Sequence, residues 1–400
     1  MGLTLAIALE TDALEKRVAV SPDAVKKYVS MGVTIKIQSG AGKDASFTDA
    51  QFREAGAKIS KSYEDTIKDA DVILCVGVPD TDQLDQIPEG TYLIGMLSPF
   101  SNEKILQDCA KRKLIAFSME FVPRISRAQS MDVLSSQSNL AGYKSVLDAA
   151  EHYSRAFPMM MTAAGTVPPA KIFVMGAGVA GLQAIATAKR LGGVVSATDV
   201  RPAAKEQVES LGASFVAVEN DEFKEAETAG GYAKEMSKDY QKQQAEFVAE
   251  HIAKQDIVIT TALIPGRPAP KLITTEMVKS MKPGSVIVDL AVETGGNCAV
   301  SKAGEVVTKH DVHVVGHLNV PSRLATDASA LYAKNLLNLL TLMIDKESQA
   351  LAVDWEDEII QGICMTKDGE VIHPRFAKKK AAKKTKAKDV VEADQDKKET

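Results

Sequence analysis

Three glycines have the spacing of a turn that binds the pyrophosphate of a dinucleotide. Gly176, Gly178 and Gly181 form G-x-G-x-x-G between the apolar run KIFVM and an amphipathic helical pattern. The first glycine permits a tight turn, the second lets backbone approach a phosphate, and the third lets the helix pack closely on the strand. Unpaired N–H groups at the start of the helix attract the negative charge. The motif predicts a dinucleotide site; a glycine-rich turn without a ligand is the alternative.

A carboxylate follows at the distance that such a site requires. The next apolar run, VVSAT, leads directly to Asp199, 23 residues after Gly176. A carboxylate there accepts hydrogen bonds from the hydroxyls of the adenosine ribose and repels a 2′-phosphate, so the pattern favours NAD over NADP. Arg201, two residues later, keeps NADP open as a ligand. Leu263 lies just past the apolar run Asp256–Ala262, and we expect it to contact the adenine or the ribose.

A polar segment earlier in the chain has side chains that suit recognition of an amide. The stretch FVPRISRAQSMDVLSSQS contains Arg124, Arg127, Gln129, Asp132 and Ser135. An aspartate accepts from the NH₂ group of a carboxamide, while serine or arginine donates to its oxygen. We therefore expect the segment to face the nucleotide. A loop that only connects two domains is the alternative.

The opening part of the chain lacks histidine. A dehydrogenase that acts on an alcohol or an amine needs a general acid or base, which is usually histidine or lysine. All six histidines lie at or after His152, and three of them, His310, His313 and His317, flank one predicted strand. Histidines in such places are more often structural or solvent-facing. The opening part therefore holds no histidine for proton transfer.

A charged segment between two predicted strands contains a flexible point beside an aromatic residue. Glu222–Glu250 is rich in charge and includes Gly230, Gly231 and Tyr232 in succession. This composition predicts a mobile lid over the nucleotide. A solvent-exposed helix pair joined by a glycine-rich turn is the alternative.

These motifs lie on a chain in which short β-branched runs alternate with helical patterns, as in parallel α/β units. The first series has predicted strands at Leu3–Ala8, Thr34–Ile37, Asp71–Gly77, Thr91–Gly95 and Leu114–Phe117, and helices at Pro22–Met31, Asp49–Ala55 and Glu103–Arg112. The second series has strands at Lys171–Met175, Val194–Ala197, Phe215–Val218, Asp256–Ala262, Val286–Leu290 and Val312–Val315.

Long helical patterns lie where the two series join. They cover Ser138–Ala156 and Ala328–Ile344, and Leu351–Pro374 has room for one more hairpin. We predict an α/β fold of two doubly wound parallel-sheet (Rossmann-like) domains, joined by long helices with a cleft between them. The first domain would comprise residues 1–137 and 328–376, and the NAD-binding domain residues 138–327. Residues 377–400, which begin with a lysine-rich run, form a tail that we predict to be disordered.

The composition disfavours several other classes of protein. The chain has 400 residues, of which 45% are hydrophobic and 25% charged, as in globular proteins. Its net charge of −5 disfavours binding of nucleic acid. Four scattered cysteines argue against a disulfide framework, and we predict no metal site. The sequence also lacks a basic leader and any run of about 18 apolar residues, so we expect neither a signal peptide nor a transmembrane segment.

The motifs together resemble those of the NAD(H)-binding component, called the α1 subunit or domain I, of proton-translocating NAD(P) transhydrogenases. The resemblance extends to about Phe376. It is most specific in PRISRAQSMDVLSSQSNLAGY, MMMTAAGTVPPAKIFVMGAGVAGLQAIATAKRLG, AETAGGYAKEM and ITTALIPGRPAPKLIT. The segment EKRVAVSP, Glu15–Pro22, is more distantly similar to alanine dehydrogenase. The chain is thus identified as a member of the alanine dehydrogenase/transhydrogenase family.

This resemblance implies a role for individual residues. Arg124, Asp132 and Ser135 would hold the nicotinamide carboxamide, and Arg124 would also reach the pyrophosphate. Gln129 would bridge towards NADP(H) on a partner subunit, which makes Gln129, Asp132 and Arg124 the predicted catalytic residues. The other residues that the resemblance places on NAD(H) are Ile125, Ser126, Ala177, Gly178, Val179, Asp199, Val200, Arg201, Gly231, Tyr232 and Gln244.

The resemblance also implies a reaction and partners. Hydride would pass directly between NAD(H) and NADP(H) on a partner subunit, and membrane subunits would couple the exchange to proton translocation. We expect a homodimer at the cytoplasmic face of the cell membrane, attached through its partners. Direct transfer between two nicotinamide rings needs a separation of about 3–3.5 Å and exclusion of water, but no acid or base.

An NAD-dependent alanine dehydrogenase is the alternative interpretation of the same resemblance. That enzyme uses a substrate-binding lysine and a catalytic histidine in its first domain. The equivalent stretches of this chain, Leu74–Pro79 and Leu93–Leu97, contain neither residue. A nucleotide-sensing module without chemistry is a third hypothesis.

Overall fold

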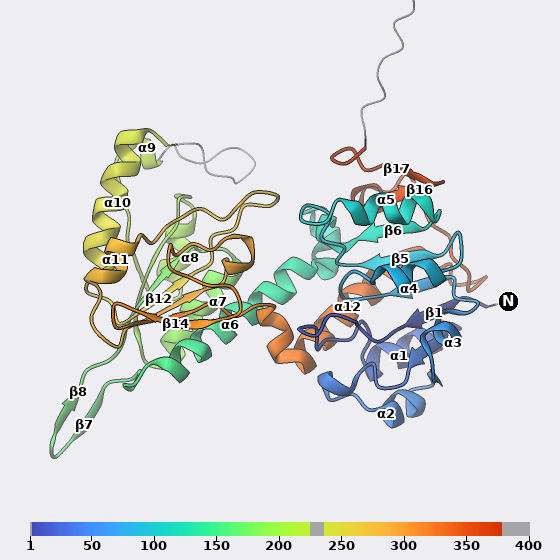
Figure 1. Ribbon diagram of the computed structural model, residues 1–400, viewed down its shortest axis with the longest axis horizontal. Coiled ribbons are helices and arrows are strands. Elements are labelled where there is room, and N and C mark those ends of the chain that lie inside the picture. Colours follow the sequence, from blue (N-terminus) through green and yellow to red (C-terminus); the bar gives the residue numbers. More distant parts are fainter. Residues whose placement is uncertain (1, 225–235, 378–400) are drawn as a thin grey trace, which may run out of the picture.

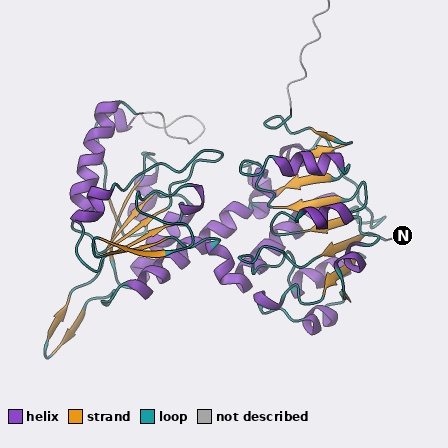
Figure 2. Cartoon of the chain, viewed as in Figure 1, coloured by secondary structure: helices purple, strands orange, loops and turns teal. Residues whose placement is uncertain are grey.

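The computed structural model describes residues 2–224 and 236–377. The chain forms two lobes, each built around a mostly parallel sheet with helices on both faces (Figures 1 and 2). The predicted α/β class with two doubly wound sheets is therefore confirmed. No helix in the described part of the chain is both long and apolar enough to cross a bilayer.

The first lobe contains an eight-stranded sheet in the order β17-β16-β6-β5-β4-β1-β2-β3. Its parallel strands are β1 (Thr4–Ile7), β2 (Thr34–Gln38), β3 (Lys58–Ser60), β4 (Val72–Leu74), β5 (Tyr92–Gly95) and β6 (Ile115–Ser118), and its antiparallel strands are β16 (Cys364–Lys367) and β17 (Glu370–Val371). The helices of this lobe are α1 (Pro22–Ser30), α2 (Asp49–Glu54), α3 (Tyr63–Ile67), α4 (Thr81–Gln86), α5 (Lys104–Lys111) and α13 (Glu358–Ile363).

The second lobe contains a seven-stranded sheet in the order β11-β10-β9-β12-β13-β15-β14. Its strands are β9 (Lys171–Met175), β10 (Val194–Thr198), β11 (Ser214–Phe215), β12 (Ile257–Thr260), β13 (Val286–Asp289), β15 (Val312–Val315) and the antiparallel β14 (Val306–Lys309). Its helices are α7 (Val179–Arg190), α8 (Ala204–Ser210), α9 (Asp221–Lys224), α10 (Lys238–Ile252) and α11 (Thr275–Ser280). A hairpin of β7 (Met160–Thr162) and β8 (Gly165–Val167) projects from this lobe (Figure 1).

Two long helices connect the lobes. Helix α6 (Val133–His152) begins with Val133 in the core of the first lobe, and its later residues Val146 and Ala149 pack in the core of the second. The 3₁₀ helix η5 (Val320–Leu324) then leads into α12 (Ala325–Met343), which returns the chain to the first core. Strands β16 and β17 join the first sheet after this return.

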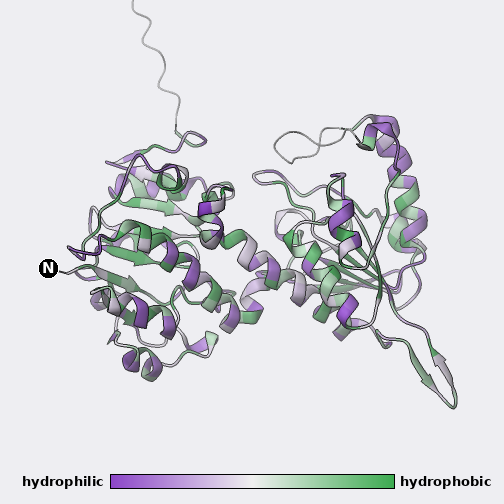
Figure 3. Cartoon of the chain, turned by 180° about the vertical axis from the view of Figure 1, so that it is seen from behind, coloured by the Kyte–Doolittle hydropathy of each residue, from purple (hydrophilic) through white to green (hydrophobic). Residues whose placement is uncertain are grey.

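The buried strands explain why both sheets are covered on two faces. Every residue of β4 (VIL), β12 (IVIT) and β13 (VIVD) is buried, as expected for parallel strands between helical layers. Figure 3 shows the same arrangement, with strands coloured as hydrophobic and outer helices mixed. Two further 3₁₀ turns, η2 (Met119–Phe121) and η3 (Ser126–Met131), fill the connection from β6 to α6.

The structure differs from the sequence predictions in several elements. The strand expected at Phe215–Val218 is the two-residue β11, and the hairpin β7–β8 was not predicted. The helix expected from Ser138 begins at Val133, because the Asp132 carboxylate caps it. Gly231, Tyr232 and the lysine-rich tail lie outside the described residues, so the lid and the disordered tail stay predictions, as do the proposed domain boundaries.

Candidate functional site

The glycine motif forms the turn between β9 and α7. Gly176 has φ of 104°, and a Cβ there would lie 2.5 Å from Thr261 Oγ1. A Cβ at Gly181 would lie 1.8 Å from the Gly176 carbonyl oxygen, so the helix approaches the turn too closely for any other residue. Gly178, at the start of α7, has open space where its Cβ would be. Two glycines thus shape the turn, and the third leaves room in front of the helix.

The Asp199 carboxylate lies beside this turn. Its Oδ2 accepts the Ala177 N–H at 2.7 Å. The Arg201 side chain holds both carboxylate oxygens, with Nε 2.9 Å from Oδ1 and Nη2 3.0 Å from Oδ2. Val200 between them is exposed. The predicted ribose ligand is therefore in place next to the phosphate turn, and it is paired with the residue that kept NADP open.

Residues on neighbouring strands complete the wall of this site. Thr261 Oγ1 donates to the Gly176 carbonyl oxygen at 3.1 Å. Asn297 is fully buried and holds Ala262 by two hydrogen bonds, of 3.0 and 2.9 Å. Leu263 is 55% exposed just after this anchored residue, as the prediction of a contact with adenine or ribose requires. Sequence reasoning missed Thr261 and Asn297, because neither belongs to the glycine motif.

A second buried carboxylate fixes the loop after β13. Asp289 is 1% exposed and accepts hydrogen bonds from the backbone of Ala291, Asn297 and Cys298 and from the hydroxyls of Thr260 and Ser301. Each oxygen thus has several donors, which keeps the buried carboxylate satisfied. Its signal in the sequence is a single acidic residue that ends the apolar run VIVD. We assign it a structural role.

Gln244 lies at the end of β10, although it comes from α10. Its Oε1 accepts the Val218 N–H at 2.8 Å, and its Nε2 lies 3.3 Å from Thr198 Oγ1. Thr198 directly precedes Asp199, so the structure brings Gln244 to the predicted ribose site. Gly231 and Tyr232 from the same predicted segment lie outside the described residues.

The 124–132 loop, residues Arg124 to Asp132, leads into α6. Asp132 caps the helix: its Oδ1 accepts the Ser135 N–H at 2.9 Å, and its Oδ2 accepts the Ser135 hydroxyl at 2.5 Å. Arg124 and Gln129 are exposed, and their side chains have no hydrogen bond or ion pair within the described parts of the chain. Ile125 and Ser126 lie between these residues at the start of η3.

Arg127 has a different environment from Arg124. Its guanidinium donates to both oxygens of Asp357, at 2.7 and 2.9 Å, and Asp357 in turn caps α13. This bidentate pair holds the pKa of the Asp357 carboxyl below its usual range. Arg127 therefore connects the 124–132 loop to α13.

Helix α6 joins the two groups of predicted site residues. Its first turn carries Asp132 and Ser135, and a Cβ at Gly142 would lie 2.0 Å from the carbonyl oxygen of Ala180 in the first turn of α7. A helix rises 1.5 Å per residue, so these two points on α6 are about 15 Å apart. One rigid helix thus sets the distance between the amide-binding group and the phosphate turn.

Loops of the two lobes also touch away from these helices. Gly266 has φ of 73°, and a Cβ there would lie 2.8 Å from Cδ1 of Phe100. Gly266 follows Leu263 in the second lobe, while Phe100 follows β5 in the first. The contact places the loop after β5 next to the loop that carries Leu263.

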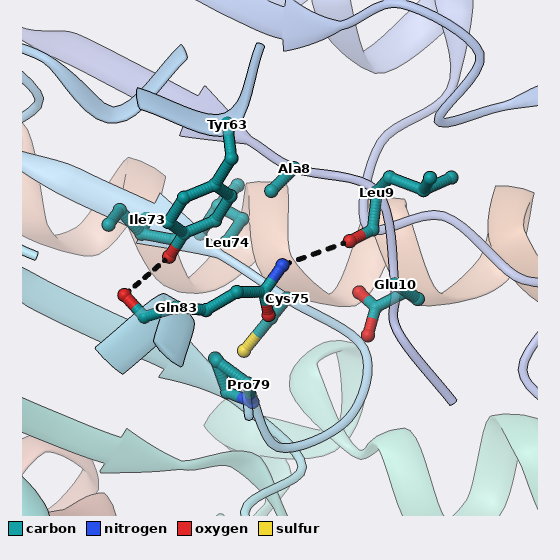
Figure 4. Close-up of a pocket in the computed structure, with 9 residues that line it drawn as sticks. All are labelled: Ala8, Leu9, Glu10, Tyr63, Ile73, Leu74, Cys75, Pro79 and Gln83. Carbon is teal, nitrogen blue, oxygen red and sulfur yellow. Dashed lines mark hydrogen bonds between the residues drawn. The ribbon is translucent and has the colours of Figure 1, made fainter. Parts of the chain in front are cut away.

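A small cavity in the first lobe lies at the carboxyl ends of β1 and β4 (Figure 4). Glu10 turns into it and accepts the N–H groups of Val76 and Gly77 at 2.6 and 3.1 Å. Burial raises the pKa of Glu10 to about 7. Above this cavity, the Tyr63 hydroxyl donates to the Gln83 carbonyl at 3.1 Å. The nine residues that line the cavity include neither lysine nor histidine.

Comparisons with known proteins agree with this geometry. Residues 6–141 match the family model "Alanine dehydrogenase/PNT, N-terminal domain", and residues 145–374 match the corresponding C-terminal domain. The first segment of a divided NAD(P) transhydrogenase subunit alpha from Rhodospirillum rubrum is 56% identical over 377 residues, 93% of this chain and 98% of that protein. A transhydrogenase structure from Sinorhizobium meliloti is 54% identical, with a TM-score of 0.84 over 92% of this chain and 100% of that one.

A solved L-alanine dehydrogenase is more distant, at 22% identity, with a TM-score of 0.78 over 94% of this chain and 98% of that one. At this identity the likeness concerns the fold alone. The two family models and the 56% identical relative confirm the resemblance stated from the sequence. This chain belongs to the alanine dehydrogenase/PNT family.

Proposed function

We propose that this chain is the NAD(H)-binding subunit of an NAD(P) transhydrogenase, and that hydride passes directly between its NAD(H) and NADP(H) on a partner subunit. One observation carries the proposal. Helix α6 bears the Asp132–Ser135 pair at its start and packs through Gly142 on the first turn behind the glycine motif. The same backbone thus presents an amide-binding group and a phosphate-binding turn at a fixed separation.

The residues present fit NAD(H). Open space in front of Gly178 admits a pyrophosphate, and the backbone of Ala177 and Val179 at the start of α7 lies beside it. Asp199 accepts from the ribose hydroxyls, while Val200, Arg201, Gln244 and Leu263 surround the adenosine.

At the other end of the cofactor, Asp132 accepts from the nicotinamide carboxamide, and Ser135 and Arg124 donate to its oxygen. Ile125 and Ser126 lie against the ring through their backbone. Gln129, exposed on the same loop, faces the partner's NADP(H).

Direct hydride transfer suits the chemistry of these residues. NADH supplies the hydride, and transfer from carbon to carbon moves no proton. The predicted nicotinamide site contains arginine, glutamine, aspartate and serine, and no histidine or lysine. Its residues therefore bind, orient and exclude water rather than transfer a proton. We assign proton translocation to membrane subunits, and a peripheral place at the cytoplasmic face of the membrane to this chain.

The first experiment mixes the purified chain with an NADP(H)-binding transhydrogenase component and follows hydride transfer from NADPH to an NAD⁺ analogue. Rapid transfer in the mixture and little transfer by either component alone would support the proposal. Brisk transfer by this chain alone, or none in the mixture, would contradict it. NADH oxidation with pyruvate and ammonia tests the alternative of an alanine dehydrogenase, for which the lysine- and histidine-free cavity beside Glu10 predicts no activity.

We also propose that the chain is a homodimer and that its hairpin forms part of the contact. Met159, Met160 and Met161 are 59, 43 and 78% exposed. A two-stranded hairpin is barely stable by itself in water, and exposed apolar side chains of this kind mark a contact surface. Met161→Glu should shift the mass measured by light scattering from dimer to monomer. A dimer that survives this change would contradict the assignment of the hairpin.

A further inference from the structure

The 124–132 loop is held from outside by two asparagines. Within the loop, η3 provides only a short 3₁₀ turn, and no strand fixes its position. The carbonyl oxygen of Ser130 accepts from Asn335 Nδ2 at 2.8 Å and from Asn338 Nδ2 at 2.9 Å. Asn335 and Asn338 are three residues apart on α12 and therefore lie on one face of that helix. Two donors on one carbonyl fix the loop between Gln129 and Asp132.

Asn335 also holds the start of α6. Its Oδ1 accepts the Ser136 hydroxyl at 2.8 Å, and Ser136 directly follows Ser135. Asn335 is only 7% exposed, and both ends of its amide are paired. One buried side chain therefore contacts the backbone two residues before Asp132 and the side chain next to Ser135.

The contacts continue through buried side chains to the EKRVAVSP segment. Gln137 Nε2 lies 3.3 Å from Ser136 Oγ, and Gln137 Oε1 accepts from Arg17 Nη1 at 2.8 Å. Arg17 forms a bidentate pair with Glu15, at 2.7 and 2.6 Å, and both side chains are nearly inaccessible. A buried ion pair costs desolvation energy, so it contributes little net stability. It does keep Gln137, one turn beyond Asp132, in a single orientation.

We propose that Asn335, with Asn338 as the second donor, is a positioning residue for the nicotinamide end of the site. The inference rests on the proposed function in one respect, that the ligand of the 124–132 loop is the nicotinamide of NAD(H). Asn335 does not touch the cofactor. It fixes the Ser130 carbonyl, and through it the placement of Gln129, Asp132 and Ser135, before the ligand arrives.

Two ligands separate this role from general stability. ADP-ribose contains the adenosine and pyrophosphate parts of NADH but lacks nicotinamide. The wild-type chain should bind NADH more tightly than ADP-ribose, measured by NADH fluorescence and by calorimetry. The double variant Asn335→Ala/Asn338→Ala should weaken NADH binding about tenfold, because loss of a preorganised hydrogen-bonded contact costs about 1.4 kcal/mol. Its affinity for ADP-ribose should change less than twofold.

Ser329→Ala is the matched control. Ser329 is fully buried on the same helix and accepts the Val18 N–H at 3.0 Å, but it does not contact the 124–132 loop. This variant should lose stability while keeping the wild-type preference for NADH. The single variants Asn335→Ala and Asn338→Ala serve as well if the double variant does not fold, and each should lose part of that preference.

The outcomes distinguish the inference from the proposed function. Equal weakening of both ligands by the asparagine variants, unchanged NADH affinity, or equal effects of Ser329→Ala would overturn the positioning role. A wild-type chain that binds NADH no better than ADP-ribose would overturn it too, while leaving the glycine-motif site intact. A wild-type chain that binds neither ligand would instead refute the proposed function itself.

Discussion

The two sheets have the same strand order but different turns after their first strand. The parallel strands run β3-β2-β1-β4-β5-β6 in the first lobe and β11-β10-β9-β12-β13-β15 in the second, and each sheet ends in added antiparallel pairing. Both sheets therefore place the carboxyl ends of their first and fourth strands side by side, where the strand order reverses. Ligands of open α/β sheets bind at this place.

The turns at these two places differ in length and chemistry. After β1, residues 8–21 form a long connection to α1, and Glu10 folds back to accept the N–H groups of Val76 and Gly77. After β9, only residues 176–178 precede α7, and the space in front of Gly178 is open. The first turn satisfies its backbone donors with a carboxylate of the protein. The second leaves the start of a helix available to an anion.

The comparison shows that strand order sets the place of a site, and the turn decides what binds there. Glu10 and Asp199 each accept backbone N–H groups beside the reversal point. Glu10 is buried with its pKa raised to about 7, whereas Asp199 is paired with the partly exposed Arg201. Only the second arrangement can exchange a protein partner for a ribose hydroxyl at the surface.

The strongest way to break this difference is to replace a glycine of the second turn. Gly176→Val should lower NADH affinity at least about 100-fold, because φ of 104° disfavours a β-branched residue and the Cβ would meet Thr261. The dissociation constant from NADH fluorescence gives the answer. Gly90→Asn is the control in the first lobe, where φ is 82° and nothing lies near the Cβ. Unchanged affinity in Gly176→Val would mean that the turn does not carry the site.

Glu10 provides the corresponding test of the first lobe. Because burial raises its pKa from 4.5 to about 7, the folded chain binds this proton more tightly than the unfolded chain. The free energy of unfolding should therefore fall by about 3 kcal/mol as pH rises from 4.5 to 7, and stay level above that. Glu10→Gln should remove this part of the slope. Parallel curves for the two proteins in urea titrations across this range would show that Glu10 keeps an ordinary pKa.

Asp199 tests whether the second site is specific for NAD. Asp199→Ser should weaken NADH binding roughly tenfold or more, since a hydrogen bond to a charged group contributes about 1.5–3 kcal/mol. NADPH binding should improve in the same variant, because Arg201 remains to pair with a 2′-phosphate. The double variant Asp199→Ser/Arg201→Ala should lose that gain. If Asp199→Ser weakens both nucleotides alike, the carboxylate supports the turn rather than selecting the cofactor.

The parts of this site that could be predicted from sequence are those with local signals. Gly176, Gly178, Gly181 and Asp199 lie within one strand–helix–strand unit, so their spacing alone predicts that they meet. The alternation of buried runs and helices likewise predicted two doubly wound sheets. The return of the chain to the first sheet was predicted because long helical patterns stood at both joins.

Other features depend on contacts that no local pattern reveals. Asn335 and Ser130 are 205 residues apart, and an asparagine in an apolar helix pattern does not name its partner. The hairpin β7–β8 was missed because MMMTAAGTV lacks the alternation of apolar and polar residues that marks a half-buried strand. The different environments of Arg124 and Arg127 also come from packing, since the partner of Arg127 lies beside α13.

This pair of arginines gives the smallest expected effect and compares two side chains of one loop. Arg127→Ala removes a bidentate pair with Asp357 at the surface, and such pairs contribute little, so the midpoint of thermal unfolding should fall by at most about 2 °C. NADH affinity should stay within about twofold of wild type. Arg124→Ala should do the reverse: its side chain has no hydrogen bond or ion pair within residues 2–224 and 236–377, so stability is kept while NADH binding weakens several-fold. Equal effects of the two changes on NADH affinity would show that the loop contributes general positive charge rather than a specific contact from Arg124.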